Sequence, residues 1–239
     1  MISCFETLEL QSGKFFALPA HLDHLARTVA ALDLPRLDRA CLDSALELIR
    51  TGVGQGSARV RISWNDSSAL TIATSGIHPH DKLAAVVMND WCRVGAPAAV
   101  TGLKTTRYAS ATVLRALHPS ADEAILLNEQ DEISGGAYSN VFVVLDGQLI
   151  TPPLESGCRD GVTRSLLIDS LRENGTEVLE SPIDPERFSQ ATEVFLTSTT
   201  RHVQAVGWVN GKGLPDHRPF TEQASSSFAR LLRDPSNWS

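Results

Sequence analysis

Residues 140–164, NVFVVLDGQLITPPLESGCRDGVTR, carry the pattern that determines the fold class of this chain. Two apolar runs flank Asp146-Gly147, which predicts two antiparallel strands joined by a short turn. A glycine-containing loop then leads into residues 162–173, whose apolar spacing predicts a helix. A hairpin followed by a loop that enters a helix predicts a domain of mixed α and β structure.

Upstream of this stretch, residues 1–77 predict a small α+β lobe. Phe5, Leu8 and Leu10 indicate a first strand, and alternation predicts two more over 57–64 and 69–75. Helical spacing predicts a first helix with this apolar face: Leu22, Leu25, Val29 and Leu32. A second helix is predicted over about 37–51, with this apolar face: Leu37, Cys41, Ala45 and Leu48.

Residues 78–82 predict a linker, because Gly, Pro and polar residues separate two apolar runs there. Residues 83–239 then form a larger lobe. Its expected strands are 83–90, 123–129, 193–199 and 203–209, and its further helices follow Lys104 and cover 185–191 and 222–233. Asp122-Glu123 is expected to be a solvated strand entry.

The composition argues against two classes of partner. The 239 residues contain 21 Lys and Arg against 28 Asp and Glu, a net charge of −7. A general nucleic-acid binder needs a basic face, which this balance disfavours. No stretch approaches the ~20 apolar residues of a membrane span, and no signal peptide is visible. We therefore expect neither nucleic acid nor a membrane as partner.

Cysteine and histidine positions predict no metal site. Cys4, Cys41, Cys92 and Cys158 lie far apart, which fits neither a zinc pattern nor a disulfide framework. His78 and His80 have HxH spacing, which by itself does not make a zinc site. This cysteine usage favours a reducing, cytoplasmic compartment.

Three features carry possible chemistry. Lys104 lies between a predicted strand and a helix, where it is either a surface lysine or a buried nucleophile. Residues 158–164 lead into a helix N-terminus, which is either an ordinary capped helix or a site for an anion such as phosphate. The hydroxyls of residues 197–200 are either a polar turn or further phosphate donors.

These pieces together resemble the class IV aminotransferases, the fold-type IV enzymes that use pyridoxal phosphate (PLP). The resemblance rests on an ordered set of segments from about residue 4 to 208: FETL, AHLxxL, GLKTT, ADEAILL, SNVF, DGQLITPPLESGCRDGVTR and EVFLTSTT. It implies a two-lobed fold, with a small N-terminal α+β lobe and a larger C-terminal α/β-barrel-like lobe. It also implies PLP as cofactor, an amino compound as small-molecule substrate, and a homodimer.

The resemblance assigns roles to particular residues. Lys104, in GLKTT, corresponds to the lysine that binds PLP covalently and moves the substrate proton. Val162 and Thr163, in GVTR, correspond to phosphate ligands at a helix start. Ser198 and Thr199, after the later strand, correspond to the second set of phosphate donors.

This sequence departs from the family pattern at two site positions. Gly135 stands where the family has a glutamate that bonds the pyridine nitrogen, and Glu132 lies too early to replace it without a rearranged turn. His24 replaces the arginine that grips the phosphate, with Arg27 one helical turn further on. The chain also lacks the longer segment that usually precedes FET. These departures leave open whether the chain catalyses a reaction or is a non-catalytic relative.

Within the family, the residues favour 4-amino-4-deoxychorismate lyase, which belongs to folate biosynthesis. The loop Asn65–Ser68 has no arginine, unlike the carboxylate trap of D-amino-acid transaminases. Tyr108, expected to contact the cofactor, is one position closer to Lys104 than the tyrosine of branched-chain enzymes, and Arg107 is expected to bind substrate. A branched-chain or related aminotransferase remains the alternative.

Overall fold

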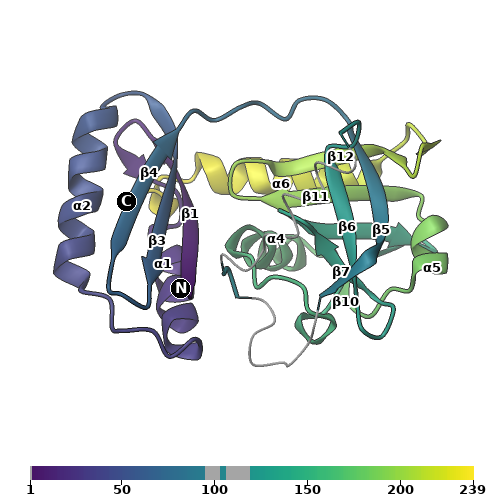
Figure 1. The fold of residues 1–239 in the computed structure, drawn as a ribbon. Helices are drawn as coiled ribbons and strands as arrows, with labels where there is room; N and C mark the ends of the chain where they lie inside the picture. Colours follow the sequence, from purple (N-terminus) through teal and green to yellow (C-terminus); the bar gives the residue numbers. More distant parts are fainter. Residues whose placement is uncertain (1, 95–102, 106–118) are drawn as a thin grey trace. The chain divides into compact units, whose positions relative to one another are not determined.

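The computed structural model describes residues 2–94, 103–105 and 119–239 (Figure 1). The chain divides into two compact units. The described part of the first unit is residues 2–79, 103–105 and 232–239, and that of the second is 80–94 and 119–231. The helix predicted after Lys104 lies outside the described residues, as do Arg107 and Tyr108.

The first unit contains a four-stranded antiparallel sheet in the order β2-β1-β3-β4. Its elements are β1 (Ser3–Gln11), β2 (Lys14–Phe15), α1 (Leu18–Ala31), α2 (Arg39–Val53), β3 (Ser57–Asn65) and β4 (Leu70–Ser75). Helix α1 packs against β1, and its face of Leu22, Leu25 and Val29 is buried as predicted. The even positions of β1 point into this core, with Cys4, Leu8 and Leu10 fully buried.

The apolar face predicted for the second helix is wrong. Cys41 is exposed and Leu48 is 74% exposed, whereas Leu42 and Leu46 are buried. Leu42 and Leu46 belong to a second apolar stripe at helical spacing, which also contains Ile49 and Val53. This second stripe packs into the core. It carries larger side chains than the predicted stripe, so burying it removes more apolar surface from water.

Two short segments distant in sequence complete the first unit, although the sequence prediction placed both in the second lobe. The backbone N–H of Phe5 donates to the carbonyl of Lys104 at 2.9 Å, and Thr105 forms a β-bridge with Cys4. The C-terminal residue Ser239 exchanges two backbone hydrogen bonds with Phe15. These pairings satisfy backbone groups of β1 and β2 that would otherwise lie at a sheet edge.

The second unit is built on a nine-stranded mixed sheet. Its path is β10-β9-β8-β11-β12-β5-β6-β7, with β13 paired to β12. Its strands are β5 (Ala84–Val94), β6 (Glu123–Asn128), β7 (Ile133–Gly136), β8 (Asn140–Leu145), β9 (Gln148–Thr151), β10 (Val178–Glu180), β11 (Glu193–Ser198), β12 (His202–Val209) and β13 (Lys212–Gly213). The sheet curls back on itself. Strand β7, at one end of the path, leads directly into β8, near the other end, and the two strands are in contact.

The predicted hairpin of the second unit is confirmed. Strands β8 and β9 pair antiparallel, and Asp146 and Gly147 have φ of 52° and 74°, which is the turn geometry that matches strand twist. The described helices of the second unit are η1 (Leu154–Ser156), α4 (Val162–Glu173), α5 (Pro185–Ser189) and α6 (Pro219–Arg233), whose last two residues belong to the first unit together with η2 (Pro235–Asn237). No helix among the described residues is long and apolar enough to cross a membrane.

Candidate functional site

Lys104 lies in the first unit, on the segment that pairs with β1. Its side chain is only 12% exposed, and its Nζ donates a hydrogen bond to Oε1 of Glu6. Of the two alternatives that the sequence leaves open for Lys104, a solvated surface lysine does not agree with this burial. The structure instead provides a nearly buried amine beside a carboxylate.

Glu6 is the centre of a buried polar cluster that the sequence reasoning did not identify. The Nδ1 atoms of His21 and His24, from one face of α1, lie 3.1 Å and 2.5 Å from its two carboxylate oxygens. Burial by itself raises the pKa of the Glu6 carboxyl, but the charge of Lys104 and the two imidazole hydrogen bonds outweigh it. The pKa of Glu6 therefore lies well below its ordinary value.

For His21, in contrast to Glu6, the effect of burial on the pKa is the larger one. Burial lowers the pKa of its imidazole, and this effect exceeds the hydrogen bond and charge of Glu6, which raise it. A neutral His21 with its proton on Nδ1 donates to Glu6 without adding a second buried cation beside Lys104. His24, which the resemblance places at the phosphate-gripping position, uses Nδ1 for Glu6, so Nε2 is its remaining ring nitrogen.

Val162 and Thr163 form the first turn of α4 in the second unit. The N-cap residue is Gly161, and no side chain caps this helix end. Both residues are at least nine-tenths buried. The backbone N–H groups of such a turn have no partner within the helix, and they carry the positive end of its dipole. The first turn of α4 also contains no acidic side chain.

Gly161 is required by close packing in this loop. An added Cβ would collide with Oδ1 of Asn140, whose Nδ2 donates to the carbonyl of Arg159 at 2.7 Å. Arg164 is directed elsewhere, because its Nη2 donates to the carbonyl of Pro152 at 2.9 Å and pairs with Glu180 at 2.8 Å. The Arg164 guanidinium therefore stabilises the loop and does not point to an anion at the helix start.

This helix start fits a phosphate group. The uncapped backbone N–H groups and the Thr163 hydroxyl are donors of the kind that an anion requires. Helix α4 packs against β11, the strand that ends at Ser198, and Thr199 follows it with its side chain buried. Val162, Thr163, Ser198 and Thr199 all belong to the second unit, whereas Lys104 and His24 belong to the first.

The Gly161→Ala substitution should weaken cofactor binding. The new methyl group would displace the Asn140 amide and with it the loop that presents the helix N–H groups. We expect the dissociation constant for PLP to rise about tenfold, the equivalent of one lost hydrogen bond. Spectroscopic titration with PLP measures this. Gly76→Ala, where an added Cβ meets nothing within 4 Å, is the matched control, and equal affinities in the two variants would contradict the assignment.

Gly135 has a backbone that excludes the side chain found there in the family. Its φ is +137°, and an added Cβ would lie 3.4 Å from the carbonyl of Ser139, so any other residue is strained there. Glu132 does not replace the missing carboxylate, because it accepts hydrogen bonds from Asn128 Nδ2 at 2.9 Å and Ser156 Oγ at 2.6 Å.

Glu123 was expected to be solvated, and this expectation is wrong. It is 3% exposed and accepts hydrogen bonds from Ser139 Oγ at 2.9 Å and the Tyr138 N–H at 3.2 Å. Arg201, directly after the residue 197–200 turn, places Nη2 3.5 Å from the same carboxylate. These contacts fix the turn between β7 and β8. The sequence alone does not decide whether a charged residue at the start of a strand is exposed or buried. For Glu123 the burial depends on the turn formed by residues distant in sequence.

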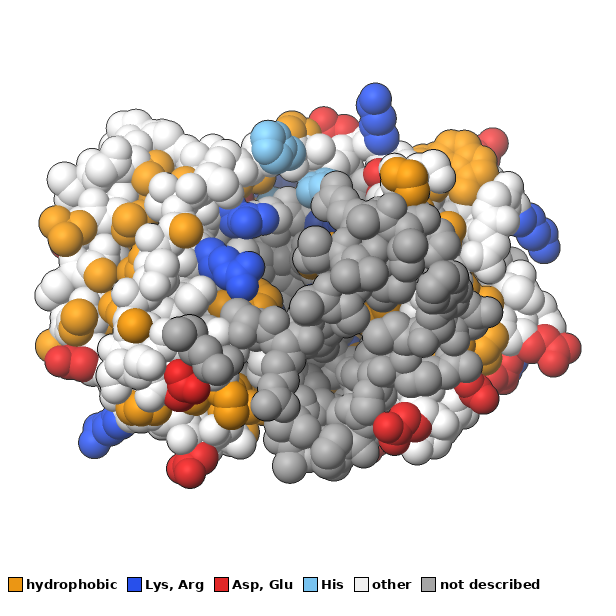
Figure 2. Space-filling view, in the orientation of Figure 1, with side chains coloured by type: hydrophobic (Ala, Val, Ile, Leu, Met, Phe, Trp, Pro, Cys, Tyr) orange, Lys and Arg blue, Asp and Glu red, His pale blue; other side chains and the backbone are white. Residues whose placement is uncertain are grey.

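The first unit also carries a cationic pair on the face of its sheet opposite the helices. The Arg61 guanidinium lies 3.9 Å from the ring centroid of Phe5. Burial and the neighbouring charge of Arg59 lower the pKa of Arg61. On the coloured part of the face shown in Figure 2, acidic, basic and scattered hydrophobic side chains are interspersed.

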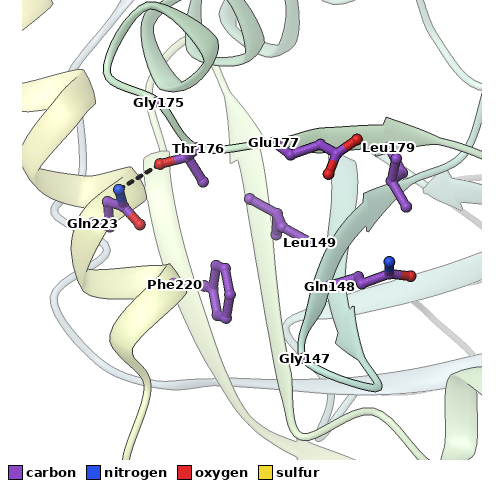
Figure 3. Close-up of a pocket in the computed structure, with 9 residues that line it drawn as sticks. All are labelled: Gly147, Gln148, Leu149, Gly175, Thr176, Glu177, Leu179, Phe220 and Gln223. Atoms are coloured by element: carbon purple, nitrogen blue, oxygen red, sulfur yellow. Dashed lines mark hydrogen bonds between the residues drawn. The ribbon is translucent and has the colours of Figure 1, made fainter.

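A separate pocket of about 350 Å³ lies in the second unit. It is lined by the turn of the β8–β9 hairpin, the segment after α4 and the start of α6, where Gln223 donates a hydrogen bond to Thr176 (Figure 3). Leu149, Leu179 and Phe220 supply apolar surface to it. None of the site residues predicted from the sequence lines this pocket.

Known proteins share both the sequence pattern and the fold. A family model described as amino-transferase class IV matches residues 3–207. A probable branched-chain-amino-acid aminotransferase from Thermotoga maritima is 27% identical over 235 residues, covering 96% of this chain and 84% of that protein. A solved structure of a putative branched-chain amino acid aminotransferase from the same organism has a TM-score of 0.88 and 25% identity, covering 99% of this chain and 88% of that one.

A second solved structure bears on the choice of reaction. It is a putative 4-amino-4-deoxychorismate lyase from Legionella pneumophila, with a TM-score of 0.84 and 20% identity, covering 96% of this chain and 91% of that one. At this identity the match shows the fold alone. The α+β fold expected from the sequence is confirmed by these structures.

Proposed function

Because this chain belongs to the amino-transferase class IV family, whose members use PLP, we propose that it is a PLP-dependent lyase that converts 4-amino-4-deoxychorismate to 4-aminobenzoate and pyruvate. Lys104 is the proposed lysine that binds the cofactor and moves the substrate proton. Val162, Thr163, Ser198 and Thr199 are the proposed phosphate ligands. When bound, the cofactor withdraws electrons from the substrate carbon that carries the amine.

The observation that carries the choice of a lyase is Gly135. A carboxylate beside the pyridine nitrogen favours the protonated ring, which withdraws electrons more strongly. Gly135 has no side chain, and its φ of +137° excludes one. An elimination driven by formation of an aromatic ring tolerates weaker electron withdrawal, whereas reversible transamination tolerates it less well.

The alternative function is aminotransferase activity toward branched-chain or related amino acids. The observation that favours it is the Thermotoga maritima relative, whose name specifies that activity and whose match covers 96% of this chain. The Arg59 and Arg61 pair supports a carboxylate-bearing substrate under either function, because two adjacent guanidinium groups favour a nearby anion.

One experiment separates the two functions. The PLP-reconstituted protein is incubated with 4-amino-4-deoxychorismate, and 4-aminobenzoate and pyruvate are followed; in parallel, L-leucine or D-alanine is supplied with 2-oxoglutarate. We expect equimolar 4-aminobenzoate and pyruvate, at a rate exceeding transamination by about 100-fold, or about 2.7 kcal/mol in barrier height. Robust transamination with no release of 4-aminobenzoate would establish the alternative. Absence of both, in protein that binds PLP, would indicate a non-catalytic relative.

The proposal includes a cytoplasmic location and a homodimer, of which the homodimer follows from the resemblance. The free state of Cys4, Cys41 and Cys158 supports a reducing compartment. Sedimentation equilibrium measures the assembly, which as a dimer has twice the chain mass of 25.8 kDa.

A further inference from the structure

The Glu6 cluster places four titratable side chains inside the apolar core of the first unit. Glu6 is fully buried on the same face of β1 as Cys4 and Leu8. His21 and His24 approach from α1, and Lys104 approaches from the segment paired with β1. These four side chains all belong to the first unit.

A carboxylate in such a core is stable only when its oxygens are satisfied and its charge is balanced. Oε1 of Glu6 accepts from Lys104 and His21, and Oε2 accepts from His24. Strand β3 places the apolar Ile62 opposite Glu6. Cys4, the neighbouring titratable group on this face, stays a neutral thiol, because burial raises its pKa to about 11. Lys104 is therefore the cation that balances Glu6.

We propose that Glu6 is the positioning residue of Lys104: its carboxylate, held by the His21 and His24 imidazoles, keeps the lysine amine in place until the lysine reacts. The two imidazoles fix both carboxylate oxygens, so the carboxylate cannot rotate away from the amine. The lysine side chain has four rotatable bonds, and the ion pair selects one arrangement from the many that they allow. The inference rests on the proposed function only in taking Lys104 as the reactive lysine.

The test measures Lys104 in the cofactor-free protein, without turnover. Trace labelling with acetic anhydride acetylates unprotonated amines, and peptide mass spectrometry reports the rate at each lysine. In Glu6→Gln the amine loses its ion-pair partner, so it is no longer held beside β1 and reaches the reagent more often. We expect Lys104 acetylation near neutral pH to increase about tenfold, the equivalent of losing one hydrogen bond to a charged group. The exposed Lys14 and Lys212 serve as internal references.

The matched control is Glu9→Gln. Glu9 is a buried carboxylate on the same strand, but it lies an odd number of positions from Glu6 and therefore points to the other face of the sheet. We expect wild-type labelling of Lys104 in this variant. An unchanged rate in folded Glu6→Gln would overturn the proposal. An equal increase in Glu9→Gln would also overturn it, because a general loosening of β1 would then be the cause.

A second measurement keeps the proposal testable if Glu6→Gln does not fold. Long-range ¹H–¹⁵N spectra of the wild-type protein identify which ring nitrogen of each histidine carries the proton. We expect the Nδ1–H form for both His21 and His24. The Nε2–H form at both would overturn the proposal, because the carboxylate would then have no imidazole donors. Borohydride reduction of the holoenzyme distinguishes the two proposals. If the pyridoxyl label lies on another lysine while the results above hold, the proposed role of Lys104 in the function is wrong, but the contact by which Glu6 positions Lys104 stands.

Discussion

The Lys104→Ala protein should lose its PLP-dependent turnover by at least about 10⁴-fold, the scale observed when a covalent catalytic group is deleted. The proposed reaction uses the amine twice, first to bind the cofactor and then to move the substrate proton. Borohydride reduction of the wild-type holoenzyme followed by peptide mapping should place the pyridoxyl label on Lys104. The label should be absent from the variant.

Loss of activity has a second possible cause, because alanine leaves Glu6 buried without its cation. Breaking a buried ion pair in this way costs about 3–5 kcal/mol of stability. Lys104→Arg separates the two causes, since a guanidinium retains the charge beside Glu6 but does not bind the cofactor covalently. We expect this variant to fold and to be inactive. Lys14→Ala, at an exposed position of β2, should be fully active, and a label on a different lysine in active wild-type protein would contradict the assignment.

Much of the fold could be predicted because its pattern is local. The Asp146-Gly147 hairpin and the α4 helix follow from turn residues and apolar spacing, and both are confirmed. Strands β7 and β10 were missed because one is glycine-rich and the other has only three residues. Neither presents enough alternation to identify a strand. The wrong face of α2 has a related cause, since its sequence contains two apolar stripes and only tertiary packing selects one.

Part of the candidate site could not be predicted in this way. Lys104 and the phosphate ligands were proposed from motifs, but nothing near Lys104 in sequence indicates that it pairs with β1. The sequence does contain an indication that Glu6 is buried. It has the same parity as Leu8 and Leu10, which places a carboxylate on the buried face of its strand, whereas Phe5 points to the other face. A charge at a buried position requires partners, and the histidines of α1 supply two of them.

The free energy of unfolding should decrease as the pH falls below about 6.5, the ordinary pKa of histidine. Burial holds the pKa of His21 below that value in the folded protein. In the interval between the two pKa values the unfolded chain binds a proton that the folded protein does not bind, so stability rises with pH there. Glu6 acts in the same direction at lower pH. Its folded pKa is depressed, so its contribution is complete above the ordinary carboxylate range near about 4.3 and is lost as the pH falls below it.

His21→Asn isolates the first of these two stages. The asparagine amide can still donate to Glu6, but it does not titrate. Each proton bound on unfolding contributes at most about 1.4 kcal/mol per pH unit, so His21 adds up to that amount to the slope of stability against pH between its folded and unfolded pKa values. Urea unfolding at a series of pH values measures the slope, which should be shallower in the variant by that amount. His217→Asn, at an exposed position, should retain the wild-type slope. If His21→Asn retains it as well, the buried neutral imidazole is not the source of acid sensitivity, and the charge balance assigned to the Glu6 cluster must be revised.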